Sequence, residues 1–145
     1  MPVVEFVKEG KRYDVPPGTN LRKYALKCQI PVYKGINRLL NCRGHRLCGT
    51  CRVELLDGKG IPARTPAEED TLIGKLLLAK KLTPNLRLAC QVTVNGDVRV
   101  MTRPNVELDK ELTKQRIILS GIFLGFGLVF LLMFGMIFFD LLKKF

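Results

Sequence analysis

The sequence predicts a small mixed α+β domain followed by a single C-terminal transmembrane helix. Short strand-like and helix-like segments alternate within residues 1–104, and residues 117–139 hold no charged side chain. With 145 residues in all, the chain allows one domain of ordinary size and excludes a large multidomain enzyme. We therefore expect a domain over residues 1–104, a helical stalk over 105–116, a transmembrane helix over 117–139 and a short basic tail over 140–145.

The first thirty residues predict a hairpin and a short helix. The segment VVEFVKEGKRYDV predicts two strands that turn at Glu9 and Gly10. After Thr19 or Asn20 as the N-cap, residues spaced as i, i+3, i+4 and i+7 form one apolar helical face: Leu21, Tyr24, Ala25 and Cys28. This spacing predicts a short amphipathic helix that packs on the strands.

The segment after this helix predicts a functional loop, and further strands follow it. No strand or helix period persists over residues 31–51, and so long an irregular run in a small domain is usually functional. CRVELLDG then predicts a strand, and Thr65, Pro66 and Glu68 predict a helix start with a capping box. LRLACQVTVNGDVRVMT predicts strands joined by a tight hairpin turn at Asn95 and Gly96. Strands on both sides of a helix predict a mixed α+β fold.

The C-terminal segment IILSGIFLGFGLVFLLMFGMIFF predicts a helix that crosses a bilayer once. Its 23 residues span about 34 Å as a helix, at about 1.5 Å per residue. The preceding segment NVELDKELTKQR, from Asn105, predicts a stalk helix that runs straight into the span. A buried core helix fits less well, because so small a domain could hardly surround this apolar rod, and the C-terminal position excludes a cleaved signal peptide.

The cations that flank the span predict its orientation. An excess of Lys and Arg favours the cytoplasmic side, and four precede the span while two follow it: Arg103, Lys110, Lys114 and Arg116 before it, Lys143 and Lys144 after it. We therefore expect a tail-anchored, single-pass membrane protein. Its N-terminal domain is expected on the cytoplasmic, stromal or matrix-equivalent side.

Four cysteines form the strongest functional signal in the sequence. They follow the pattern C-x5-C-x2-C, with a fourth cysteine after 38 further residues: Cys42, Cys48, Cys51 and Cys90. Three thiolates from one loop and a fourth from a strand can surround two irons, which favour sulfur ligands. Gly44 and Gly49 allow the loop to turn tightly and bring backbone N–H groups close to cluster sulfurs. The pattern therefore indicates an iron-sulfur site.

Other uses of these cysteines fit the pattern less well. Structural zinc usually takes two closely spaced pairs of ligands, and disulfides require an oxidising compartment. Rieske ligation requires two histidines, whereas the sequence contains only His45. We interpret His45 as an exposed loop residue, with proton coupling or partner contact as the alternative. The fifth cysteine, Cys28, is interpreted as a buried, inert core thiol because it lies on the apolar helix face.

Around the four cysteines the chain resembles the 2Fe-2S ferredoxins. The resemblance rests on NCRGHRLCGTCRVEL around the first three and RLACQ around the fourth, and it covers residues 1–102. The first gap of five residues is similar to that of the adrenodoxin-like and bacterial branch. The resemblance implies a β-grasp fold with one 2Fe-2S cluster near its edge, held by Cys42, Cys48, Cys51 and Cys90. A membrane tail departs from the usual soluble carrier.

The strongly basic composition bears on the choice of partner. The net charge is +11, yet no nucleic-acid-binding motif accompanies it, so we expect no nucleic-acid partner. Five cations lie on or beside the cysteine loop: Lys34, Arg38, Arg43, Arg46 and Arg52. They either stabilise the reduced cluster, whose charge is one unit more negative than that of the oxidised cluster, or form a solvated face. Many plant-type ferredoxins are acidic, so this basic chain instead fits an acidic docking surface on a redox partner, or an anionic bilayer surface.

These features together predict an electron carrier fixed to a membrane. We expect a membrane-anchored 2Fe-2S ferredoxin-like protein that passes single electrons between a donor and an acceptor at an energy-transducing membrane, such as the thylakoid, in association with a redox complex. The sequence has no nucleotide-binding glycine motif and no recognisable acid–base pair, so we expect no enzyme activity of its own. The alternative is a structural or assembly subunit of a respiratory or photosynthetic membrane complex, whose cluster is not an obligatory electron carrier.

Overall fold

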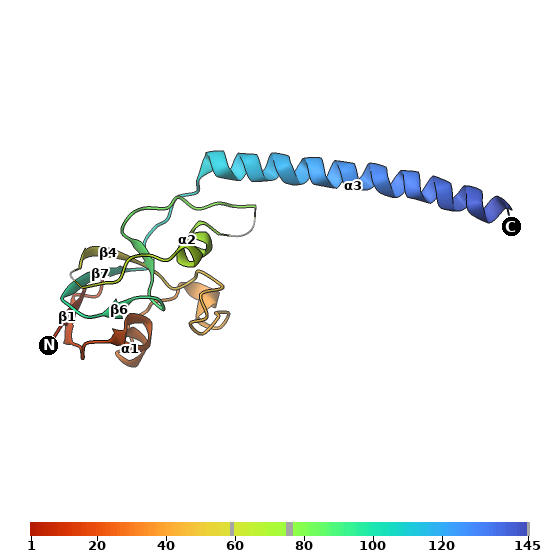
Figure 1. Cartoon of the computed structure of the whole chain (residues 1–145). Helices are drawn as coiled ribbons and strands as arrows, with labels where there is room; N and C mark the ends of the chain where they lie inside the picture. The colour runs from red at the N-terminus through yellow and green to blue at the C-terminus, as the bar shows by residue number, and fades with distance from the viewer. Residues whose placement is uncertain (59, 75–76, 145) are drawn as a thin grey trace.

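An N-terminal domain of two sheets and two short helices carries one long helix that extends away from it (Figure 1). The computed structural model describes residues 1–58, 60–74 and 77–144. The strands are β1 (Val3–Phe6), β2 (Lys11–Asp14), β3 (Thr19–Asn20), β4 (Arg52–Gly58), β5 (Leu86–Leu88), β6 (Thr93–Val94) and β7 (Val98–Thr102). The helices are α1 (Leu21–Lys27), the 3-10 turn η1 (Gly35–Arg38), α2 (Pro66–Ile73) and α3 (Lys110–Lys144).

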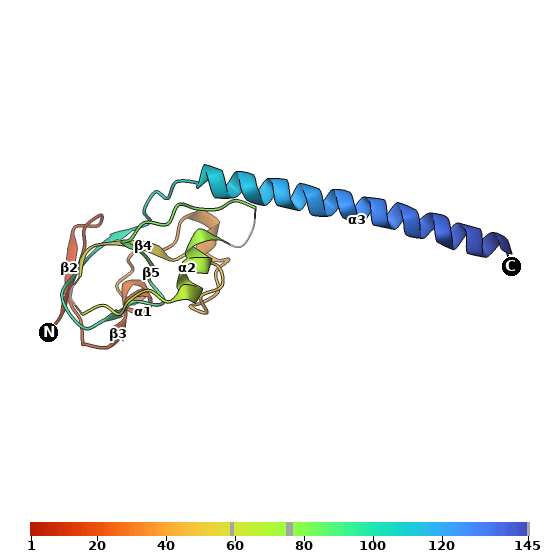
Figure 2. The same cartoon turned by 45° about the horizontal axis from the view of Figure 1, so that its top comes forward.

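The main sheet has the strand order β2-β1-β7-β4-β5. β1 and β2 form the hairpin that the sequence predicts around Glu9 and Gly10. β1 pairs with β7 in parallel, whereas β4 pairs antiparallel with both β7 and β5. α1 lies on one face of this mixed sheet in both views of the molecule (Figures 1 and 2). The arrangement is a β-grasp fold, as the resemblance implied.

The helix α1 begins and packs as its sequence predicts. Asn20 is the N-cap, because its side chain accepts a hydrogen bond from the Lys23 N–H at 3.2 Å. Leu21 and Ala25 are buried against the sheet. Cys28 is the C-cap residue and packs against the core while only half-buried, so its full burial was wrongly predicted.

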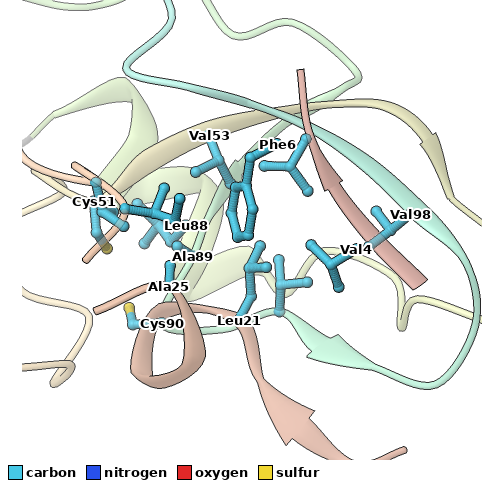
Figure 3. Close-up of a cluster of buried hydrophobic side chains, with 14 of the residues drawn as sticks. Val4, Phe6, Leu21, Ala25, Cys51, Val53, Leu88, Ala89, Cys90 and Val98 are labelled. Carbon is cyan, nitrogen blue, oxygen red and sulfur yellow. The ribbon is translucent and has the colours of Figure 1, made fainter. Parts of the chain in front are cut away.

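The hydrophobic core between α1 and the sheet extends to two of the predicted cysteine ligands. Full burial of each large aliphatic or aromatic side chain stabilises the fold by about 1.5–3 kcal/mol. Figure 3 shows side chains from β1, α1, β4, β5 and β7 meeting there, with Cys51 and Cys90 at one end: Val4, Phe6, Leu21, Ala25, Val53, Leu88 and Val98. The core therefore fixes the backbone at Cys51 and Cys90.

The turn at Asn95 and Gly96 does not form the predicted hairpin. β6 pairs with β3 in a separate two-stranded sheet, whereas β7 joins β1 and β4 in the main sheet. The Asn95 side chain accepts a hydrogen bond from the Gly18 N–H at 3.0 Å, and Asp97 accepts one from the Val3 N–H at 2.8 Å. These bonds direct the chain from one sheet to the other.

The stalk also departs from the prediction, because its first residues are extended. Leu108 bridges Lys80, and the Asp109 N–H donates to the Ala79 carbonyl at 2.9 Å. Asp109 then caps α3, since its side chain accepts from the Leu112 N–H at 3.0 Å. The helix predicted from Asn105 therefore begins at Lys110. The helix continues into the predicted basic tail as far as Lys144, and Phe145 lies outside the described residues.

The helix α3 is long and apolar enough to cross a membrane. The most apolar window within its stretch Lys110–Phe139 has a mean hydropathy of 2.7, and none of that window is buried within the chain. Exposed leucine, isoleucine and phenylalanine side chains follow it from Ile117 to Phe139. A helix that is apolar on all sides requires an apolar environment.

Candidate metal centre

The loop with three of the predicted ligands lies between α1 and β4, and Asn41 holds its turn. The Asn41 amide donates to the Arg38 carbonyl at 3.0 Å, and its oxygen accepts from the Arg43 N–H at 3.0 Å. Arg43 and Arg46 have φ angles of 51° and 61°, in the left-handed region that non-glycine residues rarely adopt. The sequence predicted no role for Asn41, because an asparagine in a loop has many possible partners.

The four predicted ligands come together as two pairs. The sulfurs of Cys42 and Cys48 are 3.2 Å apart, and the thiol of Cys51 forms a hydrogen bond with the sulfur of Cys90. Cys51 and Cys90 are only 2% and 8% exposed, whereas Cys48 is exposed and Cys42 is half-buried. Among the described residues, no three or more Cys, His, Asp or Glu side chains gather as they would around a single metal ion. Two pairs of thiols suit two irons better than one zinc ion.

Backbone N–H groups of the loop point at the Cys42 sulfur. Burial raises the pKa of Cys42, but hydrogen bonds from the Cys48 N–H and thiol and from the N–H groups of Gly44 and Leu47 lower it to about 7. The same donors stabilise a thiolate bound to iron. Gly44 has a φ of 111°, which a side chain rarely tolerates, so glycine allows this turn.

The pKa values of the two buried cysteines, Cys51 and Cys90, are shifted in opposite directions. The hydrogen bond from the Cys51 thiol has the largest effect on Cys90 and lowers its pKa, whereas burial opposes this. Hydrogen bonds from the Gln91 side chain and the Arg46 N–H lower the pKa further, as does the positive charge of Arg22, and the resulting pKa is about 6. The hydrogen bond to Cys90 and burial raise the pKa of Cys51. The sulfur of Cys90 therefore lies in the more anion-stabilising environment of the two.

Thr71 of the helix α2 holds the cysteine loop in place. The Thr71 hydroxyl donates to the Arg46 carbonyl at 2.8 Å. Gly49 lies so close that a Cβ atom there would be 2.7 Å from the Thr71 carbonyl oxygen. Arg52 donates to the Leu72 carbonyl at 3.1 Å. The structure thus gives Gly49 a reason to be glycine that the sequence did not reveal, namely its close approach to α2.

Glu68 has a different role from the predicted capping box. The N-cap is Thr65, whose hydroxyl accepts from the Glu68 N–H at 3.3 Å. The Glu68 carboxylate, however, is fully buried and accepts two hydrogen bonds from Arg87, at 3.0 and 3.1 Å, and one from the Leu88 N–H at 2.7 Å. This ion pair ties α2 to β5, two residues before Cys90.

The cations around the loop divide into an exposed and a half-buried group. Arg22, which the sequence did not single out, is half-buried, donates to the Tyr33 hydroxyl and lowers the pKa of Cys90 by its charge. Arg52 is also half-buried, and burial lowers the pKa of its guanidinium. The other predicted cations are exposed together with His45: Lys34, Arg38, Arg43 and Arg46.

The sequence family and a curated relative agree with the resemblance found around the cysteines. Residues 6–95 match the family described as the 2Fe-2S iron-sulfur cluster binding domain, which confirms the expected cofactor. A relative in Arabidopsis thaliana, named photosynthetic NDH subunit of subcomplex B 3, chloroplastic, is 37% identical over 81 residues. The match covers 54% of this chain but only 36% of that relative.

Solved structures of ferredoxins share the fold of the N-terminal domain. An ISC-like 2Fe-2S ferredoxin of Pseudomonas putida has a TM-score of 0.59 at 27% identity, covering 73% of this chain and 95% of its own. A reduced putidaredoxin variant of the same species has a TM-score of 0.54 at 26% identity, covering 69% and 94%. A ferredoxin of Rhodopseudomonas palustris, at 23% identity and a TM-score of 0.52, covers 74% and 100% and shows the fold alone.

Proposed function

The chain belongs to the family of 2Fe-2S iron-sulfur cluster binding domains and binds one 2Fe-2S cluster, and from this premise we propose that it carries single electrons between a donor and an acceptor at an energy-transducing membrane. The observation that carries the proposal is the asymmetry of the site. Cys48 is exposed while Cys51 and Cys90 are buried, so one edge of the site is open to solvent and the other is held in the core. A centre with one open edge suits electron exchange.

We propose that Cys42, Cys48, Cys51 and Cys90 would hold the cluster. The cluster supplies a one-electron redox step when bound. Gly44 supports this assignment by donating its N–H toward Cys42. Gly49 supports it by allowing the loop to pack on α2. Substrate chemistry belongs to a partner in this proposal.

The helix α3 anchors this domain in the membrane in our proposal. Its exposed apolar surface from Ile117 to Phe139 supports a crossing of the bilayer. Because more cations precede this stretch than follow it, we place residues 1–116 on the cytoplasmic, stromal or matrix-equivalent side.

We further propose that the protein works in association with a redox complex. The Arabidopsis relative is named a subunit of a photosynthetic NDH complex, which supports a membrane complex, such as one of the thylakoid, as the partner. The exposed cations beside Cys48 favour a partner surface that is acidic, or anionic lipid around it. The name of the Arabidopsis relative also supports a second candidate function. In this alternative the protein is a structural or assembly subunit whose cluster does not carry electrons during turnover.

Spectroscopy of the purified full chain tests the cluster and its ligands. After reduction, we expect the electron spin resonance signal of a one-electron-reduced 2Fe-2S cluster. Serine at Cys42, Cys48, Cys51 or Cys90 should abolish or strongly perturb this signal, whereas the matched variant Cys28→Ser should keep it. Stoichiometric zinc without iron and sulfide, or loss of the cluster in Cys28→Ser, would contradict the assignment.

Measurement in membranes separates the carrier from the structural subunit. A pulse of reductant given to membranes that contain the full chain and its redox complex should reduce the cluster. The electron acceptor of the complex should then reoxidise the cluster at the rate of turnover. A cluster signal that stays constant while the complex turns over would support the structural role instead.

A further inference from the structure

The segment between α2 and β5 lies along the first turns of α3. Arg116 donates a hydrogen bond to the Gly74 carbonyl at 2.6 Å, and the Ala79 N–H donates to the Thr113 hydroxyl at 3.1 Å. Both views show residues 77–81 of this segment lying beside the start of α3 (Figures 1 and 2). Gly74 and Ala79 are therefore held at the level of residues 113–116 of the helix.

Two leucines in this segment are left largely exposed by the described part of the chain. Leu77 and Leu78 are 51% and 58% exposed, although Ala79 beside them is fully buried. They line an open groove of about 790 Å³ together with Leu47 and Cys48 of the cysteine loop. The leucines therefore form an exposed apolar ridge next to the open edge of the site.

The position of this ridge along α3 coincides with the expected surface of the bilayer. Ile117 begins the uncharged stretch, so Arg116 is the last cation before it. The headgroup layer on each side of a bilayer is about 5–7 Å thick, which corresponds to about 3–5 helical residues. Residues 113–116, and the segment bonded to them, fall within that layer.

We propose that Leu77 and Leu78 insert into the boundary between lipid headgroups and acyl chains, and so make a second membrane contact beside α3. The inference rests on the crossing of the bilayer by α3 that is proposed above. Short apolar segments flanked by cations bind at this boundary, and the exposed Lys81, Lys110 and Lys114 lie on the neighbouring stretches of chain. Lipid is the favoured occupant because the bilayer must surround Ile117, one residue beyond the Arg116 bond.

This contact determines how the domain is oriented on the membrane. A single helix alone leaves the domain free to tilt, whereas two points of contact restrict the tilt. Because Leu47 and Cys48 line the same groove as the leucines, the open edge of the site then lies at the membrane surface. An electron partner must reach the cluster in that layer.

Tryptophan fluorescence in lipid vesicles tests the contact in the full chain, which contains no native Trp. The test variant is Leu78→Trp. If the cluster absorption of Leu78→Trp is disturbed, Leu77→Trp replaces it as the test variant. Leu26→Trp is the matched control, because Leu26 is a 41% exposed leucine on α1. Phe126→Trp in the middle of α3 reports the crossing itself. Vesicles of phosphatidylcholine and phosphatidylglycerol carry bromine either near the headgroups or deep in the acyl chains.

We expect shallow bromine to quench Leu78→Trp, deep bromine to quench Phe126→Trp, and neither to quench Leu26→Trp. Quenching of Phe126→Trp without quenching of Leu78→Trp would overturn the second contact while leaving the crossing intact. A blue-shifted Leu78→Trp emission that bromine does not quench would identify a second copy of the chain as the occupant and would also overturn the contact. If Phe126→Trp is not quenched, the crossing fails and the contact fails with it.

Discussion

The two halves of the cysteine site are built in opposite ways. Cys51 immediately precedes β4 and Cys90 lies two residues after β5, and both stand at the end of a core of packed apolar side chains. Cys42 and Cys48 come from an irregular loop whose arginines adopt left-handed backbone angles. The first pair is buried and the second is half-buried or exposed.

This difference shows how a small domain can hold a redox centre and still expose it. The buried half keeps its geometry because packed side chains have few alternative positions. The loop half depends on hydrogen bonds to the loop backbone, including the bond from Thr71 to the Arg46 carbonyl. We therefore expect changes beneath the buried half to affect stability most, and changes around the exposed half to affect electron exchange most.

The largest effect is expected from Glu68→Gln beneath the buried half. The change leaves the guanidinium of Arg87, itself only 6% exposed, without its counter-charge. Breaking a buried ion pair from one side costs about 3–5 kcal/mol of folding stability. The measurement is the urea concentration at which the cluster absorption disappears, which should fall markedly.

The matched control is Glu69→Gln, one residue further along α2. Glu69 is 47% exposed and lies 3.8 Å from Arg64, so its loss should cost less than about 1 kcal/mol. Equal midpoints for Glu68→Gln and Glu69→Gln would show that the Arg87 pair does not support the buried half.

The next effect concerns the contact of the cysteine loop with α2 at Gly49. Gly49→Ala adds a Cβ atom 2.7 Å from the Thr71 carbonyl and also strains a φ of 59°. Gly10→Ala has nearly the same φ, 62°, with no atom within 4 Å, and so measures the strain alone. We expect about 1–2 kcal/mol for Gly10→Ala and about 1–3 kcal/mol more for Gly49→Ala. Thermal unfolding of both variants with the cluster in place measures the difference, and equal losses would exclude a tight contact with α2.

The sequence predicted the fold best where local patterns decide it. The turn at Glu9 and Gly10 and the N-cap of α1 depend on residues close in sequence, and both agree with the structure. The turn at Asn95 failed because its side chain bonds to Gly18, 77 residues away, which no local pattern reveals. The start of α3 failed for the same reason, since residues 107–109 pair with residues 79–81 in an extended form.

The sequence singled out candidate ligands but not the residues that support them. Cysteine spacing is a local signal, and it selected Cys42 and Cys48, whose sulfurs lie 3.2 Å apart. Glu68 has an ordinary position at a helix start, and only the tertiary fold brings it to Arg87. Arg22 likewise has no sequence signal, because its position near Cys90 depends on how α1 packs. The cations chosen from the sequence were those next to the cysteines in the chain, and Arg43 and Arg46 among them are exposed.

A moderate effect on the reduction potential is expected from Arg22→Gln. Its positive charge favours the more negative reduced cluster, so removing it should lower the potential by about 30–60 mV, or about 1 kcal/mol. Arg22→Lys keeps the charge and should keep most of the potential, although it changes the bond to Tyr33. A redox titration followed by electron spin resonance measures all three proteins. If the Lys and Gln variants shift equally, Arg22 acts by positioning the loop and not by its charge.

The smallest effect on the cluster itself is expected from removing two exposed cations, in Arg43→Gln with Arg46→Gln. Solvent and salt screen both side chains, so the potential should move less than for Arg22→Gln. The rate of electron exchange should respond instead, because these cations attract anionic acceptors to the edge formed by Cys48. At low salt, oxidation of the reduced cluster by the anion ferricyanide should slow, and its oxidation by the cation hexaamminecobalt should quicken.

The control for this double variant changes the same net charge far from the site. Lys8→Gln with Lys11→Gln removes two exposed cations from the turn and strand of the β1–β2 hairpin. If attraction to the exposed edge is local, these changes should leave the ratio of ferricyanide to hexaamminecobalt rates nearly unchanged, since charges more than about 10 Å away are screened at about 0.1 M salt. The contrast between the two double variants should be largest at low salt and should vanish as salt is added. Equal responses of both double variants would assign the effect to net charge and leave Arg43 and Arg46 as a solvated face.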